Sequence, residues 1–202
     1  MEFKKIQLNG FKSFAEKADF LIEDGLTGIV GPNGCGKSNI VESLRWAMGE
    51  TSAKSMRGSG MEDVIFSGTS NKASKNIAEV TIEVENKDKE GPVQYRDHDQ
   101  IQIKRKIEKD KGSKFYINGK EVRARDAQMF FADLSTGAHS PSMISQGRIG
   151  ALVTAKPTDR RAILEEAAGI SGLHVRRHEA ELRLGAAENN LKRADELRRQ
   201  QE

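Results

Sequence analysis

A glycine-rich segment between an apolar run and a helix-like run most constrains what this chain can fold into. Residues 31–38 read GPNGCGKS and fit the pattern G-x-x-x-x-G-K-[ST]. Glycines at 31, 34 and 36 leave room for backbone N–H groups to approach an anion and permit positive φ. Residues 26–30 before the loop are expected to form a strand, and Lys37 to begin a helix whose N-terminal dipole faces the anion. This strand, loop and helix predict an α/β fold that binds phosphate.

The side chains of the loop indicate a magnesium nucleotide. In loops of this pattern the lysine, here Lys37, reaches the β and γ phosphates, and the hydroxyl of Ser38 binds Mg²⁺. A common GTPase would also carry an Asn-Lys-x-Asp motif, but residues 71–74 read NKAS and lack the aspartate. ATP with Mg²⁺ is therefore the expected cofactor. The alternative, an ordinary glycine-rich turn, is disfavoured because both flanking runs match the pattern.

The acidic half of such a site is not evident. P-loop ATPases hold magnesium and activate water with an acidic residue that ends an apolar strand. The nearest candidate is residues 130–133, FFAD, which are too few and lie in a helical pattern. The chain is thus expected to cradle the triphosphate without the groups that activate water.

The residue pattern in the rest of the first 170 residues predicts several strands and two helices. Alternating apolar residues predict strands at 3–8, 19–22, 78–84 and 101–107, with a hairpin connection after residue 85 and a short strand at 64–66. Asn118-Gly119 predicts a two-residue hairpin within 115–122, because both turn positions need positive φ. Residues 10–14 are expected to form a turn with Phe11 and Phe14 exposed. Helices are predicted at 127–134 and at 158–168, the second capped by Thr158 and ended by Gly169, with a loop at 136–147 between them.

The C-terminal residues have a different pattern. Small and apolar side chains recur at spacings of three and four among charged ones, at Leu173, Ala180, Leu184, Ala187, Leu191 and Ala194. This pattern predicts the start of a coiled coil, giving a lobe at 1–170 and an arm from 171 to 202. The alternative is an amphipathic helix packed on the lobe.

Composition bears on the cellular compartment and on possible binding partners. A single cysteine, Cys35, fits a reducing compartment, and no signal peptide or membrane span is evident, so a cytoplasmic protein is expected. The net charge of +3 is too small to imply a polyanion partner by itself. Basic residues that could contact DNA phosphates gather at Lys104, Arg105, Lys106, Lys120 and Arg123. A solvated strand face is an equal alternative, because alternation places Lys104 and Lys106 on one side and Arg105 on the other.

Six blocks in order along the chain resemble bacterial SMC proteins, the structural maintenance of chromosomes family. They are FKKIQLNGFKSF, GPNGCGKSNIVESLRWAMGE, KSMRGSGMEDVIFSGT, FYINGKEVRARD, ISQGRI and KPTDRRAILEEAAGI. The resemblance implies the N-terminal lobe of an ABC-type P-loop ATPase head, with mixed sheets around the P-loop helix and the start of a long antiparallel coiled coil. In that family a C-terminal lobe, reached through the arm, carries the acidic strand and the signature motif. The resemblance thus implies one explanation for the missing acidic strand and for the coiled coil that only begins in this chain, namely that the head is split into two lobes.

The resemblance also implies roles for individual residues. The residues expected on the triphosphate and Mg²⁺ are Pro32, Asn33, Gly34, Cys35, Gly36, Lys37, Ser38 and Asn39. Gln146 matches a glutamine that helps to bind the metal and senses the γ phosphate, and Arg57 matches an arginine near the phosphates that couples DNA to hydrolysis. Lys12, Ser13 and Asp63 would line the outer side of the nucleotide. Ser59-Gly60 departs from the Gly-Lys of many members, which weakens the inference at that point.

The function implied is ATP-dependent head engagement for chromosome condensation and segregation. Two heads would sandwich ATP in a nucleoid-associated homodimer, a kleisin with its accessory subunit would bridge them, and the kleisin's N-terminal domain would contact the coiled coil near residues 173–197. Contacts to DNA would be made to the backbone. Hydrolysis is expected of the whole protein and not of this chain alone. The alternatives are an SMC-like repair ATPase and a P-loop kinase with Arg160 and Arg161 in a lid.

Overall fold

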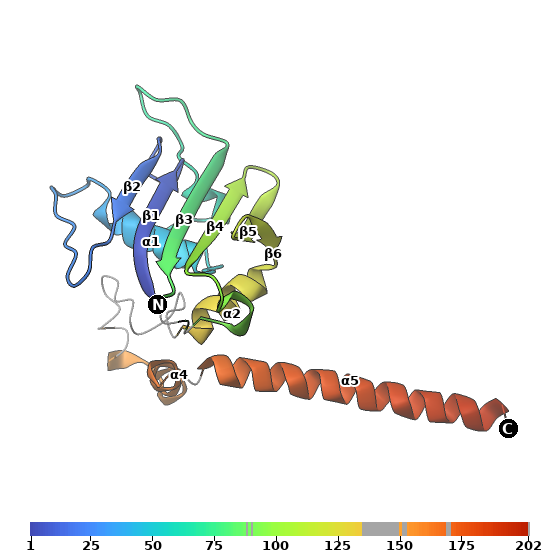
Figure 1. The fold of residues 1–202 in the computed structure, drawn as a ribbon. Helices are drawn as coiled ribbons and strands as arrows, with labels where there is room; N and C mark the ends of the chain where they lie inside the picture. Colours follow the sequence, from blue (N-terminus) through green and yellow to red (C-terminus); the bar gives the residue numbers. More distant parts are fainter. Residues whose placement is uncertain (88, 90, 135–149, 151–152, 169–170, 202) are drawn as a thin grey trace.

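A computed structural model describes residues 1–134 except 88 and 90, together with 150, 153–168 and 171–201. Its centre is a six-stranded sheet in the order β2-β1-β3-β4-β5-β6 (Figure 1). The strands are β1 (Glu2–Asn9), β2 (Ala18–Leu21), β3 (Ile77–Glu85), β4 (Gln100–Glu108), β5 (Gly112–Ile117) and β6 (Lys120–Val122). Each described pair of neighbours is antiparallel. Antiparallel neighbours need only short connections, and hairpins join β3 to β4, β4 to β5 and β5 to β6.

The alternation predicted for β3 and β4 is confirmed. Ala78, Val80, Ile82 and Val84 of β3 are buried on one face, and Ile101, Ile103 and Ile107 of β4 lie on the same face. The predicted hairpin is also confirmed, because Asn118 and Gly119 connect β5 to β6 with φ of 47° and 79°. One face of the sheet is therefore apolar and must be covered.

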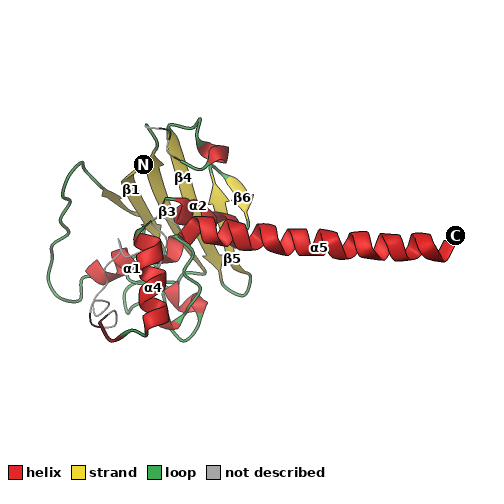
Figure 2. Cartoon of the chain, turned by 90° about the horizontal axis from the view of Figure 1, so that it is seen from below, coloured by secondary structure: helices red, strands yellow, loops and turns green. Residues whose placement is uncertain are grey.

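Helix α1 (Lys37–Ala47) covers that face, and it contacts β3 and β4 (Figure 2). Trp46 near its C-terminal end is fully buried, and its ring lies 5.5 Å from the ring of Phe11. The helix ends at Ala47, and Gly49 follows in a left-handed conformation at φ 104°. Packing of α1 on the sheet fixes its N-terminus, and with it the position of the glycine-rich loop.

The strand predicted at residues 26–30 is wrong. These residues form an extended loop, in which Leu26 is 99% and Val30 is 93% exposed. A strand requires a neighbour for its backbone N–H and C=O groups, and no described strand lies alongside this run. The sequence has strand-forming residues here, but the described part of the chain supplies no partner for them.

Three smaller predictions are corrected. Phe11 is fully buried rather than exposed, because it packs on Trp46 and bridges to Ile65. The strand predicted at 64–66 is the end of a 3₁₀ turn, η2 (Met61–Val64), followed by that isolated bridge. Thr158 is not a cap, because α4 (Pro157–Ala167) begins at the preceding proline, whose fixed φ suits the first helical position.

The remaining helices lead away from the sheet. Helix α2 (Ala124–Asp133) packs near β5 and contacts α5 (Ser171–Gln201), a continuous helix of 31 residues that extends far from the sheet (Figure 1). Short turns η1 (Lys54–Met56) and η3 (Val93–Tyr95) lie in the connections. Leu182, Leu184 and Leu191 of α5 are exposed, and no described helix is long and apolar enough to span a membrane. The loop predicted at 136–147 and the stop at Gly169 lie outside the described residues.

Candidate nucleotide-binding site

The glycine-rich loop has the backbone that an anion cradle requires. Gly34 and Gly36 have φ of 83° and 97°, and Gly36 is the residue from which α1 starts. A Cβ atom at Gly36 would lie 2.6 Å from Oγ of Ser13, so a side chain is excluded by space as well as by conformation. Backbone N–H groups and the positive end of the α1 dipole therefore meet at the same place.

Lys37 crosses the mouth of this loop. Its Nζ donates hydrogen bonds to the carbonyl oxygens of Gly31 and Pro32, both at 2.6 Å, and lies 3.9 Å from Sγ of Cys35. Ser38 follows in the first turn of α1 with its side chain exposed. Asn33 and Cys35 are also exposed. The loop thus presents a cation, a hydroxyl and backbone donors within eight residues.

Three further predicted residues lie together beside α1. Nδ2 of Asn39 donates a hydrogen bond to Oγ of Ser13 at 2.8 Å, and Oδ1 of Asn39 accepts one from Nη2 of Arg57 at 3.0 Å. Asn39 is the third residue of the helix that begins at the loop. The fold therefore brings Ser13 and Arg57 to Asn39 in the first turn of α1, although 44 residues separate them in sequence.

A residue that the sequence analysis missed joins this group. Glu42 on α1 is buried, and its two carboxylate oxygens pair with Nζ of Lys12 and Nε of Arg57. Nζ of Lys12 also donates to the carbonyl oxygen of Met56 at 2.5 Å. The available sequence signal was spacing, because an acidic residue four positions after Ser38 lies on the same face of a helix.

Asp63 closes a neighbouring loop. Its Oδ2 accepts hydrogen bonds from the backbone N–H and the hydroxyl of Ser59, at 2.6 and 2.8 Å, and from the N–H of Gly60 at 3.0 Å. The hydrogen bonds from Gly60 and Ser59 lower the pKa of Asp63 below its usual range. A cavity of about 640 Å³ lies next to Arg57 and Asp63 but is lined by no residue of the glycine-rich loop. The nucleotide contact expected of Asp63 stays a prediction.

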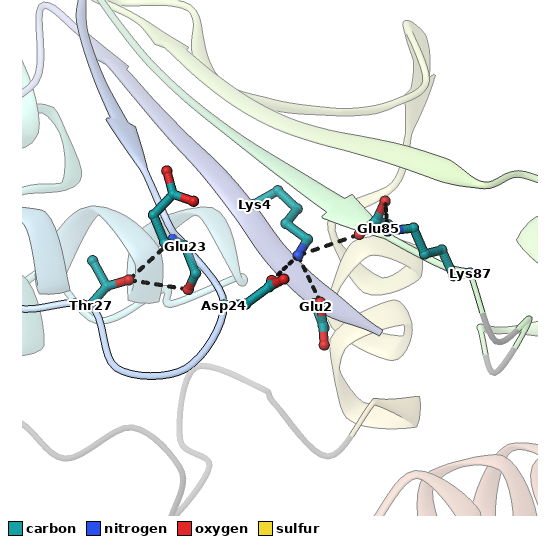
Figure 3. A network of polar contacts seen from close by, with 7 residues as sticks. All are labelled: Glu2, Lys4, Glu23, Asp24, Thr27, Glu85 and Lys87. Atoms are coloured by element: carbon teal, nitrogen blue, oxygen red, sulfur yellow. Dashed lines mark hydrogen bonds and ion pairs between the residues drawn. The ribbon is translucent and has the colours of Figure 1, made fainter.

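A polar network anchors the segment that leads into the loop. Nζ of Lys4 on β1 pairs with Asp24, with Glu2 at 2.8 Å and with Glu85 at 3.4 Å (Figure 3). The hydroxyl of Thr27 bonds to the backbone of Glu23 at 3.1 and 3.3 Å. The hydrogen bond to Asp24, followed by that to Glu2, raises the pKa of Lys4 above its usual range. These exposed contacts tether the start of the segment to β1, while residues 26–30 extend beyond them.

The structure removes Arg105 from the residues predicted to contact DNA. Its side chain is 3% exposed, and its guanidinium donates to the carbonyl oxygens of Trp46 and Glu50 at 2.6 and 2.7 Å and to Oγ of Ser113 at 2.8 Å. The group also stacks 4.5 Å from the centre of the Trp46 ring. Burial lowers the pKa of Arg105 to about 10, which still leaves it charged at neutral pH. Arg105 therefore fastens the C-terminal end of α1 to the sheet.

The other predicted DNA residues remain accessible. Lys104 and Lys106 point to the face opposite Arg105, as the alternation indicated, and Lys120 and Arg123 are exposed. Lys106 lies 3.8 Å from Glu79, and Nζ of Lys104 lies 5.3 Å from the centre of the Tyr116 ring. Glu79 therefore partly neutralises the charge of Lys106, and the role of this face stays a prediction.

The acidic half of the site is not found in the described residues. Residues 130–133 belong to α2, where Phe130 and Phe131 are buried in the core. No group of three or more His, Cys, Asp or Glu side chains that could hold a metal occurs among the described residues. Gln146 lies outside the described residues. The described residues therefore include a loop of the phosphate-binding pattern but no such cluster of metal-binding side chains.

A glycine-rich loop at the start of a helix, with a lysine across its mouth, defines a phosphate-binding lobe of the P-loop class. Comparison with known proteins specifies the family. The protein-family model of the RecF/RecN/SMC N terminal domain matches residues 2–148 of this chain. The chain belongs to this family, and within it to the N-terminal head part of the bacterial SMC proteins.

Individual relatives agree with this assignment. Chromosome partition protein Smc of Rhodopseudomonas palustris is 56% identical over 197 residues, and that of Cereibacter sphaeroides is 57% identical over 197 residues. The match covers 98% of this chain but only 17% of each relative. The Smc head domain of Pyrococcus furiosus, solved with an extended coiled coil and bound to the C-terminal domain of ScpA, aligns with a TM-score of 0.77 at 32% identity. That alignment covers 96% of this chain and 48% of the solved one. The expected fold, an ABC-type ATPase lobe with the start of a coiled coil, is thereby confirmed.

Proposed function

We propose that this chain is the ATP-binding half of an SMC ATPase head, which acts in chromosome partition together with a C-terminal lobe that the chain does not contain. The observation that carries the proposal is the loop geometry, in which Gly34 and Gly36 hold positive φ and Lys37 lies across the carbonyls of Gly31 and Pro32. The names of the relatives favour chromosome partition over a repair ATPase or a kinase.

The residues present fit a magnesium nucleotide. Gly36 carries no side chain beside Ser13, where a Cβ atom would lie 2.6 Å from Oγ, and the hydroxyl of Ser38 is exposed at the first turn of α1. Lys37 would exchange its carbonyl partners for the β and γ phosphates, and Ser38 with Gln146 would hold Mg²⁺. The metal would neutralise charge on the phosphates. Arg57 and Lys12 would supply positive charge from the adjoining loops.

A second lobe would complete the site. The exposed apolar run at 26–30 has backbone groups and side chains suited to pairing with a strand. Such a strand, ending in Asp or Asp-Glu, would place the missing acidic group beside the loop. Head engagement would then require a second SMC head, whose signature motif would meet this P-loop across the bound ATP. A solved SMC ATPase covering 83% of this chain was studied for ATP-driven dimerization and DNA stimulated activation.

Further partners are proposed from the relatives and from the charged face. Solved Smc heads bind the C-terminal domain of ScpA, so a kleisin with its accessory subunit is the expected partner. Contact of the kleisin's N-terminal domain with α5 near residues 173–197 is also proposed. Lys104, Lys106, Lys120 and Arg123 would contact the DNA backbone, which predicts binding that weakens steeply with salt. The assembly would be a homodimer in the cytoplasm, associated with the nucleoid.

The proposal is tested by replacing Lys37 in the full-length protein. Lys37→Ala should abolish binding of a fluorescent ATP analogue and reduce ATP hydrolysis to background, since the ammonium is lost from the phosphate site. Lys54→Ala, which removes a lysine from the exposed turn η1, is the matched control and should leave both intact. Binding and hydrolysis that survive Lys37→Ala would contradict the proposed function.

A further inference from the structure

Glu42 is a buried carboxylate on the helix that starts at the P-loop. Its side chain is 11% exposed, and each oxygen faces a cation: Oε1 pairs with Nε of Arg57, and Oε2 pairs with Nζ of Lys12. Burying a carboxylate is costly unless it is paired and hydrogen-bonded. The position of Glu42 is therefore explained by these two cations, which come from separate loops.

Both cations occupy strained backbone. Lys12 and Arg57 have φ of 48° and 54°, a region that residues with a side chain seldom adopt. Each conformation is held by a backbone hydrogen bond, from the N–H of Lys12 to the carbonyl of Val64 at 2.7 Å and from the N–H of Arg57 to the carbonyl of Lys54 at 3.0 Å. Such strain persists where surrounding structure imposes it, and it gathers at binding sites. Two strained loops thus converge on one carboxylate.

The guanidinium of Arg57 is held on two sides. Nε faces Glu42, and Nη2 donates to Oδ1 of Asn39 at 3.0 Å, while Asn39 itself donates to Ser13 at 2.8 Å. The Arg57 side chain is nevertheless 59% exposed, and its Nη1 has no partner among the described residues. A guanidinium carries five N–H donors, so donors remain after both contacts are made. Arg57 is thereby fixed beside the P-loop helix with donors left for an anion.

We propose that Glu42 is a positioning residue, which orients Arg57 so that its remaining donors face the triphosphate of a nucleotide bound at the P-loop. The inference rests on the proposed function. Lys12 balances the second oxygen of Glu42 and ties it to the carbonyl of Met56, one residue before Arg57. A cation held in place before the ligand binds needs little reorganisation, and it stabilises developing charge more effectively than a free side chain.

The test is a double-mutant cycle on ATP hydrolysis by the full-length protein, with kcat and KM measured separately. Glu42→Gln removes the charge at nearly constant shape, and Arg57→Gln removes the guanidinium. If Glu42 acts through Arg57, each single change should lower kcat/KM by about tenfold, because one charge-assisted contact is lost. The double variant should fall no more than about twofold below Arg57→Gln, since nothing remains to be oriented.

Two further variants separate positioning from general support of the helix. Glu42→Asp keeps the charge on a shorter side chain, so its kcat/KM should lie between those of the wild type and Glu42→Gln. If Glu42→Gln fails to fold, the double-mutant cycle is run with Glu42→Asp instead. Glu50→Gln disturbs another buried carboxylate at the far end of α1, whose Oε2 lies 2.9 Å from Nη2 of Arg45, and should lower the melting temperature while kcat/KM is kept.

Distinct results would overturn the proposal. Wild-type kcat/KM in Glu42→Gln, or a double variant reduced by the product of the two single effects, would show that Glu42 does not act through Arg57. If the Lys37→Ala variant hydrolysed ATP as fast as the wild type, the proposed function would be overturned, and this inference with it.

Discussion

At the scale of single residues, two buried charged side chains have different roles, one in supporting the fold and the other at the proposed site. Arg105 and Glu42 are both buried, and both contact or belong to α1. Arg105 donates hydrogen bonds to carbonyl oxygens at the C-terminal end of the helix, whereas Glu42, in the middle of the helix, pairs with Lys12 and Arg57. A buried cation therefore supports the fold at the C-terminal end of the helix, and a buried carboxylate in the middle of the helix serves the proposed nucleotide site.

Arg105→Met tests the supporting role. The change would leave the carbonyls of Trp46 and Glu50 buried without their donor, so the free energy of unfolding should fall by about 2–4 kcal/mol. Urea unfolding followed by circular dichroism measures it. Lys104→Met, on the opposite face of β4, is the control and should change stability by less than about 0.5 kcal/mol. An equally stable Arg105→Met protein would contradict this account.

Gly36→Ala tests the loop. Alanine at φ 97° is strained, and its Cβ would lie 2.6 Å from Oγ of Ser13, so we expect the affinity for a fluorescent ATP analogue to fall by about tenfold or more. Titration of full-length protein measures this affinity. Gly60→Ala is the matched control, because its φ is −133° and a Cβ there meets no atom within 4 Å. Equal affinities for the two variants would show that the loop tolerates a side chain.

At the scale of elements, α1 and the segment before the loop behave differently. The helix is held by the sheet along its length, with Ile40, Trp46 and Ala47 buried. The segment at 26–30 is anchored only at its start, by the network around Lys4, and carries exposed apolar side chains beyond it. The P-loop therefore joins a helix packed on the sheet to a segment that pairs with no strand among the described residues.

Changing Leu26 and Val30 together to aspartate tests whether that partner is the C-terminal lobe. These side chains are exposed, so the melting temperature of the 202-residue chain should stay within about 2 °C of wild type. Association with a separately produced C-terminal lobe should weaken by about tenfold or more, because charges would be buried at the contact. Calorimetric titration measures the association. A large loss of stability in the isolated chain would instead place the two residues in its own core.

At the scale of the whole molecule, the chain is a sheet lobe with one long helix leaving it. It spans 17% of the length of the Smc relatives it matches, and Glu42, a carboxylate on the helix that starts at the P-loop, is paired with two cations. We therefore expect nucleotide binding and hydrolysis to be separable properties. On the proposed function, this lobe would supply the first, and the second would need groups from elsewhere.

The isolated 202-residue chain should bind ATP weakly and release no phosphate above background. The reason is that the described residues include no cluster of three or more His, Cys, Asp or Glu side chains that could hold a metal ion. A phosphate-release assay with and without added C-terminal lobe measures this, and activity should appear only when both lobes are present. Lys37→Ala in the mixture is the control. Steady turnover by the chain alone would refute the split site.

Local chemistry allowed several features to be predicted from the sequence alone. Positive φ at Gly36 and at Asn118-Gly119, the alternation in β3 and β4, and the start of α1 at Lys37 depend on neighbours close in sequence. Those residues carry their conformational preference with them, so the P-loop and the hairpin were evident before any packing was known.

Only the tertiary structure decided the features that depend on distant partners. Arg105 was predicted to face DNA but fills the space between Trp46 and Phe115, and Glu42 gains its role because two loops bring Lys12 and Arg57 to it. Residues 26–30 have strand-forming side chains, yet without a neighbouring strand their backbone hydrogen bonds cannot form. The sequence by itself determined that phosphate can be cradled here. Packing between segments far apart in the chain decided which charges lie beside that cradle and which are buried to hold it.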